Sequence, residues 1–441
     1  RARGEAAWNE NGGIHAISVE EIDVHTPLTG RARGSLHLVP DSGEANGSGF
    51  RMEASLEAPE IPAGEAFSVL VRDPFQESLE LLEGASLAGE GALTLRAEGP
   101  LRAPRATGRL RIAARELSLE GIRAEGVAME VPFVHEPTWS DAAPRREAGF
   151  IRAERIDAGP VSIEQVHLPF HLEQGTYRLD APSRLSVLDG VIELRSGTLA
   201  LSPEGLSVRS SLLGKDIRVG KLARAHGVKA FQGRLSFDFD PIALEGSLIS
   251  SRGGVLLEAF GGQMSFSDLS VNNAFQPYFD LQVREGRVRD VRLADVGEVF
   301  RFGLMSGVLQ GTVNNLQVTG GELTSFLLDV ETVPVSGVPQ YLNRSAIDSI
   351  RRITSGPFGL LEETFFSKFR FADFGFTCAL EDGVFRLRGK YTDGRVEYVM
   401  RPRWYQFPRV TIINGYPERP YDWRAIVLNL RQIYNKDFEK D

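Results

Sequence analysis

Apolar and polar residues alternate along most of this chain, and many of the alternating runs begin with a glycine. In residues 233–237, 262–266 and 383–387, a leucine, methionine or phenylalanine recurs at every second position after the glycine. A period of two is typical of a β-strand, whereas an amphipathic helix repeats every 3.6 residues. The glycine supplies the tight turn that enters the strand. The pattern therefore predicts many short strands.

Each predicted strand has one apolar face and one polar face. Leu235, Phe237 and Phe239 share one side of their strand, while Ser236 and Asp238 share the other. Residues 279–283 and 326–330 follow the same pattern. A sheet that is wet on one side only favours antiparallel meanders over a parallel sheet buried on both faces.

Helical patterns are few. Short helices are predicted at residues 215–227, 291–303, 339–353 and 358–369, and an amphipathic helix from residue 422 with Trp423 and Ile426 on one face. They are too few to cover the apolar face of about 20 to 30 strands. That face can pack on a second sheet, close as a barrel or curl into an open groove, and the periodicity leaves all three open.

Composition and charge narrow the function. The formal net charge of -9 over 441 residues is spread along the chain, which argues against a nucleic-acid surface. The single cysteine, Cys378, lies in an alternating run and is predicted to be a small buried apolar residue. No signal segment and no run of about 18 apolar residues occurs. We therefore expect a soluble piece of a longer chain, with any anchor or export signal upstream of residue 1.

Catalytic and metal-binding patterns are missing from the sequence. His167 and His171 flank Pro169, which disfavours a helix, and in a strand they stand more than about 10 Å apart, too far to share a metal. No nucleophile elbow, phosphate loop or dinucleotide fingerprint occurs. Asp238 and Asp240 are expected on a solvated strand face. The prediction is a protein that is not an enzyme and has no metal or cofactor.

Arginines follow the same outward register, as in Arg386 and Arg388 and in Arg284, Arg287 and Arg289. A solvated strand face is the favoured interpretation, and contact with anionic lipid headgroups is the weaker alternative. The 26 phenylalanines outnumber the 9 tyrosines, and many of them fall on the predicted apolar faces between residues 231 and 385. Such a lining suits a packed core or a non-specific surface for acyl chains.

From residue 185 onward the chain resembles the AsmA-like superfamily of bacterial envelope proteins, to which TamB, YhdP and YdbH belong, and it is nearest the YdbH-like group. The resemblance is carried by the glycine-led strands in residues 185–201 and the order of the elements in residues 307–321, 326–332, 338–353 and 374–389. Residues 1–184 have the same kind of strand pattern but no distinct motif of the superfamily, and residues 401–441 resemble no part of it. The chain is accordingly divided into an N-terminal part of a groove (1–184), a C-terminal groove with short helices (185–400) and a terminal segment with an amphipathic helix (401–441). The alternation also breaks between residues 132 and 144, where a long loop is expected.

The resemblance implies a mainly-β fold in which a long, highly curved antiparallel sheet forms an open apolar groove. It implies bridge-like transport of phospholipid between the inner and outer membranes of a Gram-negative bacterium, through the periplasm and without catalysis. The protein would be tethered to the inner membrane by an N-terminal anchor and could meet an outer-membrane or periplasmic protein. Nucleic acid is not an expected partner.

The predicted lipid-binding residues are apolar positions of the later strands. They are Leu235, Phe237, Phe239, Met264, Phe266, Phe279, Leu281, Val283, Phe326, Leu328, Val330, Phe374, Phe376, Phe385 and Leu387. Two other functions stay open. One is a periplasmic scaffold or assembly factor for outer-membrane proteins that acts through exposed strand edges. The other is an enzyme with a carboxylate pair, for which the sequence offers no pair that can be named.

Overall fold

The fold is that of a computed structural model, which describes residues 2–8, 14–26, 30–40, 49–73, 76, 82–135, 146–202, 205–225, 231–273, 278–354, 367–405, 409–414 and 419–428. Strands make up 72% of it, so the predicted mainly-β class is confirmed. A long antiparallel sheet of 25 strands contains most of them, and a second sheet has three. The chain divides into two compact units, and each is described separately.

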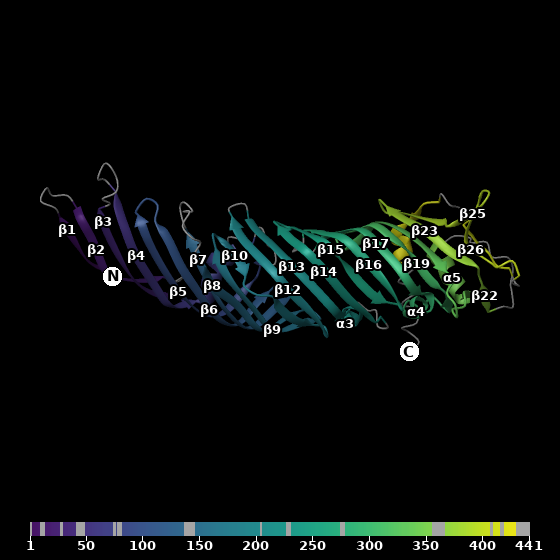
Figure 1. The fold of residues 1–441 in the computed structure, drawn as a ribbon, viewed down its shortest axis with the longest axis horizontal. Coiled ribbons are helices and arrows are strands. Elements are labelled where there is room, and N and C mark those ends of the chain that lie inside the picture. Colours follow the sequence, from purple (N-terminus) through teal and green to yellow (C-terminus); the bar gives the residue numbers. More distant parts are fainter. Residues whose placement is uncertain are drawn as a thin grey trace. The chain divides into compact units, whose positions relative to one another are not determined.

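Unit 1 comprises Arg1–Val187, Ile192–Leu212 and Ala243–Ser247. Its elements follow one another as a meander in which each strand pairs with the next, as from β2 to β9 (Figure 1). The elements are β1 (Ala2–Trp8), β2 (Ile14–Thr26), β3 (Gly30–Pro40), β4 (Phe50–Pro62), α1 (Ala63–Phe67), the π-helix η1 (Ser68–Arg72), β5 (Ser86–Pro100), β6 (Arg105–Leu119), β7 (Ile122–His135), β8 (Glu147–Ala158), β9 (Val161–Glu173), β10 (Thr176–Leu179) and β11 (Ser183–Val187).

Strands β12 (Gly190–Ser202), β13 (Gly205–Arg218) and β14 (Gly233–Glu245) contribute residues to both units. Unit 2 comprises Leu188–Val191, Leu213–Ile242 and Leu248–Asp441. Its further elements are α3 (Gly220–Ala225), β15 (Leu248–Ala259), β16 (Gly262–Asn272), β17 (Asp280–Arg292), α4 (Leu293–Val299), β18 (Met305–Ser306), β19 (Val308–Thr319), β20 (Glu322–Val333), β21 (Tyr341–Asn343), α5 (Arg344–Thr354), β22 (Lys368–Arg370), β23 (Asp373–Glu381), β24 (Val384–Gly389), β25 (Tyr391–Asp393), β26 (Val396–Arg401), β27 (Ile412–Asn414) and β28 (Tyr421–Asp422).

Tight glycine turns join neighbouring strands, as predicted. Between β23 and β24, Glu381 pairs with Val384 across the two-residue turn Asp382-Gly383. Both turn residues have positive φ, 51° and 75°. Such a turn has the twist that a right-handed pair of strands needs, and an Asp-Gly pair adopts it readily. The turn therefore sets the register in which β23 and β24 pair.

Bulges interrupt the strands and shift the alternation by one residue. In β19, Asn315 has a φ of 52°, and the pairing with β20 shifts between Asn314 and Gln317. A bulge places two residues opposite one, so the residues after it exchange faces. Val313 before the bulge and Leu316 after it are both half-buried, while Gln310 and Gln317 are exposed. The apolar residues of one strand thus stay on one side of the sheet.

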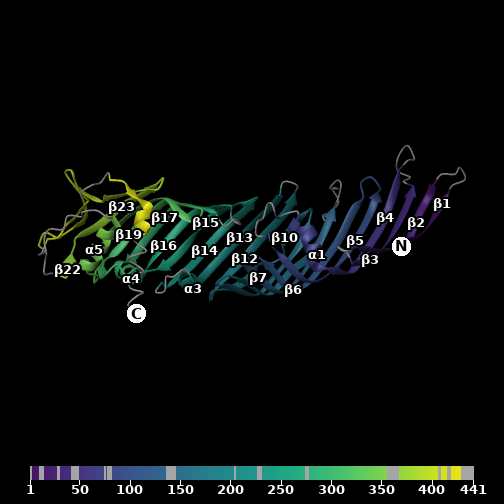
Figure 2. The same ribbon diagram turned by 180° about the vertical axis from the view of Figure 1, so that it is seen from behind.

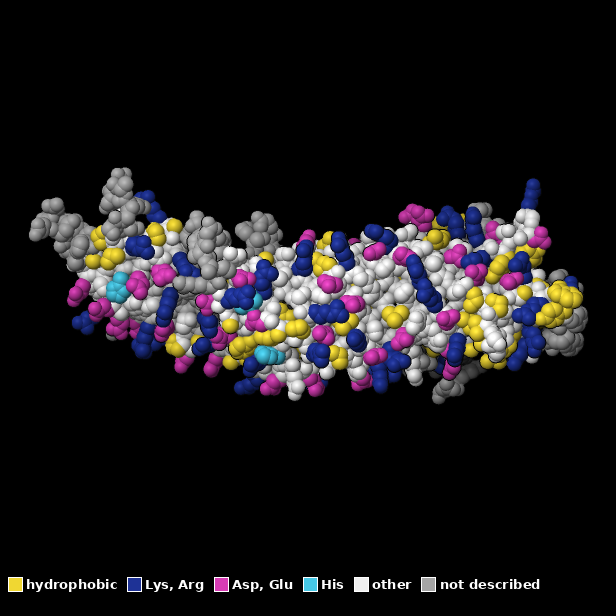
Figure 3. Space-filling view, in the orientation of Figure 1, with side chains coloured by type: hydrophobic (Ala, Val, Ile, Leu, Met, Phe, Trp, Pro, Cys, Tyr) yellow, Lys and Arg dark blue, Asp and Glu magenta, His cyan; other side chains and the backbone are white. Residues whose placement is uncertain are grey.

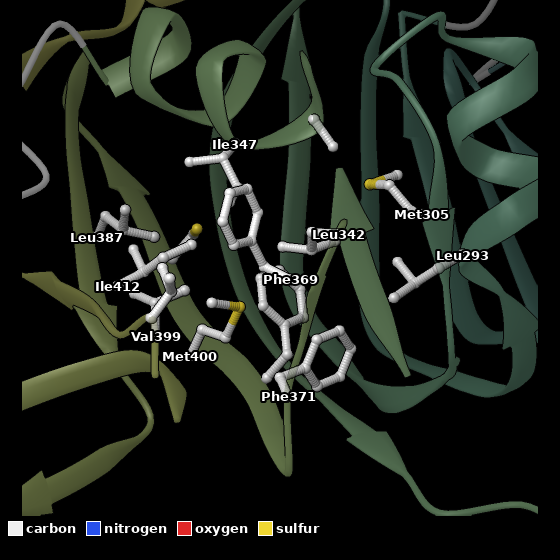
Figure 4. Close-up of a cluster of buried hydrophobic side chains, with 14 of the residues drawn as sticks. Leu293, Met305, Leu342, Ile347, Phe369, Phe371, Leu387, Val399, Met400 and Ile412 are labelled. Atoms are coloured by element: carbon white, nitrogen blue, oxygen red, sulfur yellow. The ribbon is translucent and has the colours of Figure 1, made fainter. Parts of the chain in front are cut away.

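The main hydrophobic core lies in unit 2 (Figure 4). Side chains from the three-stranded sheet β18–β21–β22, from α5 and from strands β23, β24, β26 and β27 meet there. Leu342, Ile347, Phe371, Met400 and Ile412 are at most 1% exposed. Cys378 belongs to this core, as predicted, and burial raises the pKa of its thiol.

Unit 1 has a smaller core in which alanine and valine predominate. Helix α1 packs on β4, β5 and β6 through Ala63 and Ala66, which are buried (Figure 2). The sequence did not predict this helix. Small side chains let its backbone approach the sheet closely, as Gly64 does, where a β-carbon would lie 2.7 Å from the Leu87 carbonyl oxygen.

The predicted helices are shorter than expected. Residues 215–218 belong to β13, and α3 begins at Gly220; α4 and α5 lie within their predicted ranges, but residues 341–343 form β21. Of the predicted helix 358–369, the part up to residue 366 lies outside the described residues, and its last two residues, Lys368 and Phe369, are wrong because they belong to β22. Residues 423–428 are helical, with Ile426 buried and Trp423 half-buried.

The expected loop at residues 132–144 is wrong at its start. Pro132 belongs to β7, opposite Arg109, and its carbonyl oxygen accepts a hydrogen bond of 2.9 Å from the Tyr177 hydroxyl. Residues 136–145 lie outside the described part of the chain. The three-part division at residues 184 and 400 stays a prediction.

Replacing Phe371 by alanine tests the core of unit 2. Phe371 is fully buried and its ring centroid lies 5.8 Å from that of Phe374. We expect Phe371→Ala to lower the free energy of unfolding of unit 2 by about 3 to 5 kcal/mol, because it leaves a cavity. Leu327→Ala, at a position 40% exposed, is the control and should cost less than about 1 kcal/mol. Equal losses of stability in urea unfolding would contradict this core.

Candidate functional site

Pairing between strands aligns apolar residues into rows that cross unit 2. Directly opposed residues in neighbouring strands lie on the same face of a sheet. One row is Val255, Phe266, Gly286, Val313, Leu328, Cys378 and Leu387, and the next is Leu257, Met264, Val288, Gly311, Val330, Phe376 and Gly389. We call these two rows the apolar ladder. It crosses β15, β16, β17, β19, β20, β23 and β24.

The apolar ladder is exposed to different degrees along its length. From β15 to β19 its apolar side chains, such as Val255, Phe266 and Val313, are half-buried, and β15, β16 and β19 pack chiefly against neighbouring strands. At β23 and β24 the core of unit 2 covers it, and Cys378 and Leu387 are buried. Trp423 packs at the same end, with ring centroids 5.7 Å from Phe326 and 5.8 Å from Phe385. The accessible part of the ladder therefore runs from β15 to β19 and reaches Leu328 in β20, where Val330 is already buried.

The predicted lipid-binding residues fall into three classes by exposure. Phe279 is exposed and lies just before β17. Five are buried, namely Val283, Val330, Phe374, Phe385 and Leu387. Nine are half-buried, namely Leu235, Phe237, Phe239, Met264, Phe266, Leu281, Phe326, Leu328 and Phe376. The strand pairing brings Met264, Phe266, Leu328, Val330, Phe376 and Leu387 together in the apolar ladder.

Several apolar positions of the ladder were not among the predicted residues. Val288 and Val313 stand between polar residues as Phe266 does, so the period-two signal could have identified them. Val255 and Leu257 flank Leu256, which hides the alternation there. The prediction favoured phenylalanine and leucine and included only two valines, Val283 and Val330. Valine supplies less surface per residue but keeps the face continuous from strand to strand.

Unit 1 carries a comparable row of its own. Ile61, Gly91, Ile112, Met129, Ile151 and Leu168 are directly opposed from β4 to β9. Ile112 is buried, whereas Ile151 is 36% exposed. None of these residues was predicted to bind lipid. Their small and branched side chains alternate with charged residues as those of unit 2 do.

Two phenylalanine rings of the apolar face lie against glycines. A β-carbon on Gly214 would come within 2.4 Å of the Phe237 ring, and one on Gly286 within 2.8 Å of the Phe266 ring. Phe237 and Phe239 stack with their ring centroids 5.2 Å apart. The glycines let the rings settle onto the sheet, so side chains larger than hydrogen at positions 214 and 286 would push them outward.

A hollow of about 700 Å³ lies over β13 to β17. Much of its lining belongs to positions that alternate with the apolar ladder, including Ser265 opposite Arg287 and Ser267 opposite Glu285. The Arg287 guanidinium also pairs with Glu285 at 2.7 Å. Val255 and Phe266 of the apolar ladder also line the hollow, so the candidate lipid surface is the ladder, part of which borders this hollow.

The opposite rows carry paired charges. Figure 3 shows basic and acidic side chains interspersed along one face of the molecule. On β6 and β7, Glu130 accepts hydrogen bonds from Arg109 at 2.5 Å and Arg111 at 3.0 Å. Burial alone would raise the pKa of Glu130, but the two guanidinium groups outweigh it and hold that pKa below its usual value. Pairs of this kind keep the polar face soluble and discourage strand edges from joining.

The histidines, aspartates and arginines considered above for catalysis, metal binding or headgroup contact do not gather in one site. His171 Nδ1 lies 2.5 Å from an Asp180 carboxylate oxygen, while His167 lies opposite Arg152. Asp238 and Asp240 are exposed, as are Arg284, Arg287, Arg289 and Arg388. Among the described residues, no group of histidine, cysteine and carboxylate side chains could hold a metal ion. In the same part of the chain, no helix has the length and apolar character to span a bilayer.

Comparison with known proteins identifies no family for this chain. No family model, curated protein or solved structure matches the chain. The structure itself establishes a mainly-β protein with one long antiparallel sheet.

Glu130 provides a test of the polar face through its dependence on pH. Its lowered pKa means that the charged form stabilises the fold above the usual carboxyl pKa, and that this contribution is lost as the pH falls through the folded-state pKa. We expect Glu130→Gln to lower the free energy of unfolding by about 1 kcal/mol at neutral pH and by much less at about pH 3. Urea titrations at the two pH values measure this.

The matched control for that variant is Glu116→Gln. Glu116 pairs with Arg123 at 3.3 Å across β6 and β7, and both side chains are more than 40% exposed. Its loss should change stability by less than about 0.5 kcal/mol. A Glu130→Gln effect that is independent of pH would contradict the ion-pair explanation.

Proposed function

We propose that this protein carries phospholipid along the apolar face of its long sheet, as a bridge-like conduit between two membranes. The observation that supports it best is the apolar ladder from β15 to β19, whose apolar side chains are only half-buried on one face while charged residues occupy the other. A large exposed apolar surface rimmed by polar residues is typical of a binding surface.

The free-energy cost of exposing acyl chains to water favours such a conduit. Each methylene removed from water is worth about 0.8 kcal/mol, so two acyl chains face a high barrier to crossing an aqueous space unaided. A row of valine, leucine, methionine and phenylalanine offers weak, non-directional contacts of similar strength at each strand. A lipid can then move from strand to strand without being held at a single site.

The resemblance to the AsmA-like superfamily supports the same proposal. It would place the protein in the periplasm of a Gram-negative bacterium, tethered to the inner membrane, with a possible protein partner in the periplasm or at the outer membrane. Phospholipid headgroups would remain in water while the acyl chains contact the ladder. The mechanism requires neither a cofactor nor a catalytic residue.

Mass spectrometry of the purified protein, combined with a charge placed in the ladder, tests the proposal. Phe266→Glu puts a carboxylate where acyl chains would lie, and removing an unpaired charge from water is costly. We expect phospholipid to copurify with the wild type and to fall by more than about tenfold in Phe266→Glu.

Ser265→Glu is the matched control. It adds the same charge one residue away, at an exposed position that alternates with the ladder. It should retain the wild-type amount of lipid, and the thermal melts of both variants should stay close to that of the wild type. A wild-type protein free of lipid, or equal losses in the two variants, would refute the conduit. Photocrosslinking from position 266 to a polypeptide instead of lipid would favour the assembly-factor alternative.

A further inference from the structure

A short segment of unit 2 leaves the core and returns to it. Met400 and Ile412 are at most 1% exposed, and Val410 is also buried. Between them, Arg401 pairs with Asp373 at 2.9 Å, and its guanidinium lies 4.5 Å from the centre of the Tyr391 ring. Both ends of the segment are thus held by the core, and Arg403, Trp404 and Tyr405 lie close to the end at Met400.

The segment presents two aromatic side chains to solvent. Trp404 is 79% exposed and Tyr405 is 60% exposed. Their ring centroids lie 5.6 Å apart, with the rings nearly perpendicular at 87°. Aromatic rings that bury so little of their surface contribute little to folding. Their place on the surface needs a different reason.

Arginine side chains are held beside these rings. Arg403 Nη1 donates a hydrogen bond of 2.9 Å to the Tyr405 hydroxyl, and Arg409 donates one to the Trp404 carbonyl oxygen. Residues 401–416 contain three arginines and no acidic residue, although the whole chain has a net charge of -9. Figure 3 shows apolar and basic side chains together at the end of the molecule where Figure 1 labels β22, β25 and β26.

We propose that Trp404 and Tyr405, with Arg403 and Arg409, dock unit 2 on the surface of an anionic phospholipid bilayer. Tryptophan and tyrosine favour the boundary between headgroups and acyl chains, because each has an apolar body and a polar tip. Arginine is attracted to anionic headgroups. The proposal goes beyond the conduit, since it requires nothing of the apolar ladder.

The local shape favours a bilayer over a protein partner. Tryptophan, tyrosine and arginine are also frequent in protein interfaces, but a stable interface needs about 20 to 30 residues on each side. Here Trp404 and Tyr405 are neighbours in one short segment between two buried ends. A bilayer needs no complementary shape, so a few inserted rings and cations can hold to it.

Cosedimentation of the full chain with vesicles tests this docking. Vesicles of phosphatidylcholine alone are compared with vesicles that also contain phosphatidylglycerol. We expect binding to the mixed vesicles, a loss of at least about tenfold in Trp404→Ala/Tyr405→Ala, and a loss of about fivefold for each of Arg403→Ala and Arg409→Ala. Tyr278→Ala, which removes a tyrosine that is 72% exposed elsewhere in unit 2, should bind as the wild type does.

Fluorescence identifies the inserted ring. Lipids with brominated chains should quench part of the wild-type tryptophan emission in mixed vesicles, and this quenching should disappear in Trp404→Phe. Equal sedimentation of the wild type and Trp404→Ala/Tyr405→Ala would overturn the proposal, as would shielding of Trp404 by self-association without vesicles.

The two proposals fail separately. The Trp404→Ala/Tyr405→Ala variant should lose vesicle docking and keep its copurified phospholipid. Phe266→Glu should lose copurified phospholipid and still dock on vesicles. Loss of both properties in either variant, with an unchanged thermal melt, would contradict the assignment of docking to the segment between Met400 and Val410.

Discussion

Antiparallel pairing between successive strands is the constraint on which the rest of this structure depends. Because opposed residues lie on the same face, each new strand extends the apolar rows laid down by the previous one. The row that passes from Phe266 through Val313 to Leu328 exists only while the register holds. A slip of one residue would bring Ser265 or Asn314 into it. Turns such as Asp382-Gly383 and bulges such as that at Asn315 therefore determine the face as much as the apolar residues do.

The local alternation of apolar and polar residues was enough to predict the strands. It was not enough to predict where a strand continues past a bulge. Residues 233–239 are read correctly because none of them has a positive φ that would interrupt the alternation. In β19 the apolar residues Val313 and Leu316 are three apart, a spacing that by itself indicates a helix, and only the positive φ of Asn315 explains it. Helix α1 escaped prediction because alanine and glycine carry little periodic signal. Its position depends on close contact with the sheet. The sequence of the helix alone carries no information about that contact.

The exposure of the candidate surface could not be read from the strands themselves. Met264 and Phe385 both stand two residues after the glycine of an alternating run, yet the first is half-buried and the second is buried. The difference comes from residues remote in the sequence, since Trp423 and the core around Met400 cover Phe385. The alternation thus predicted which side of the sheet is apolar, and later elements decided which part of that side remains open.

The core of unit 2 links the two proposals through one set of contacts. Met400 and Ile412 hold the ends of the segment with Trp404, and the same cluster covers the apolar ladder at β23 and β24. An acyl chain that follows the ladder would meet buried Cys378 and Leu387 there, with no apolar surface left to contact. It would have to leave the ladder before β23. The covered end would then not pass lipid through itself, and its contribution would be to hold the open face close to the bilayer.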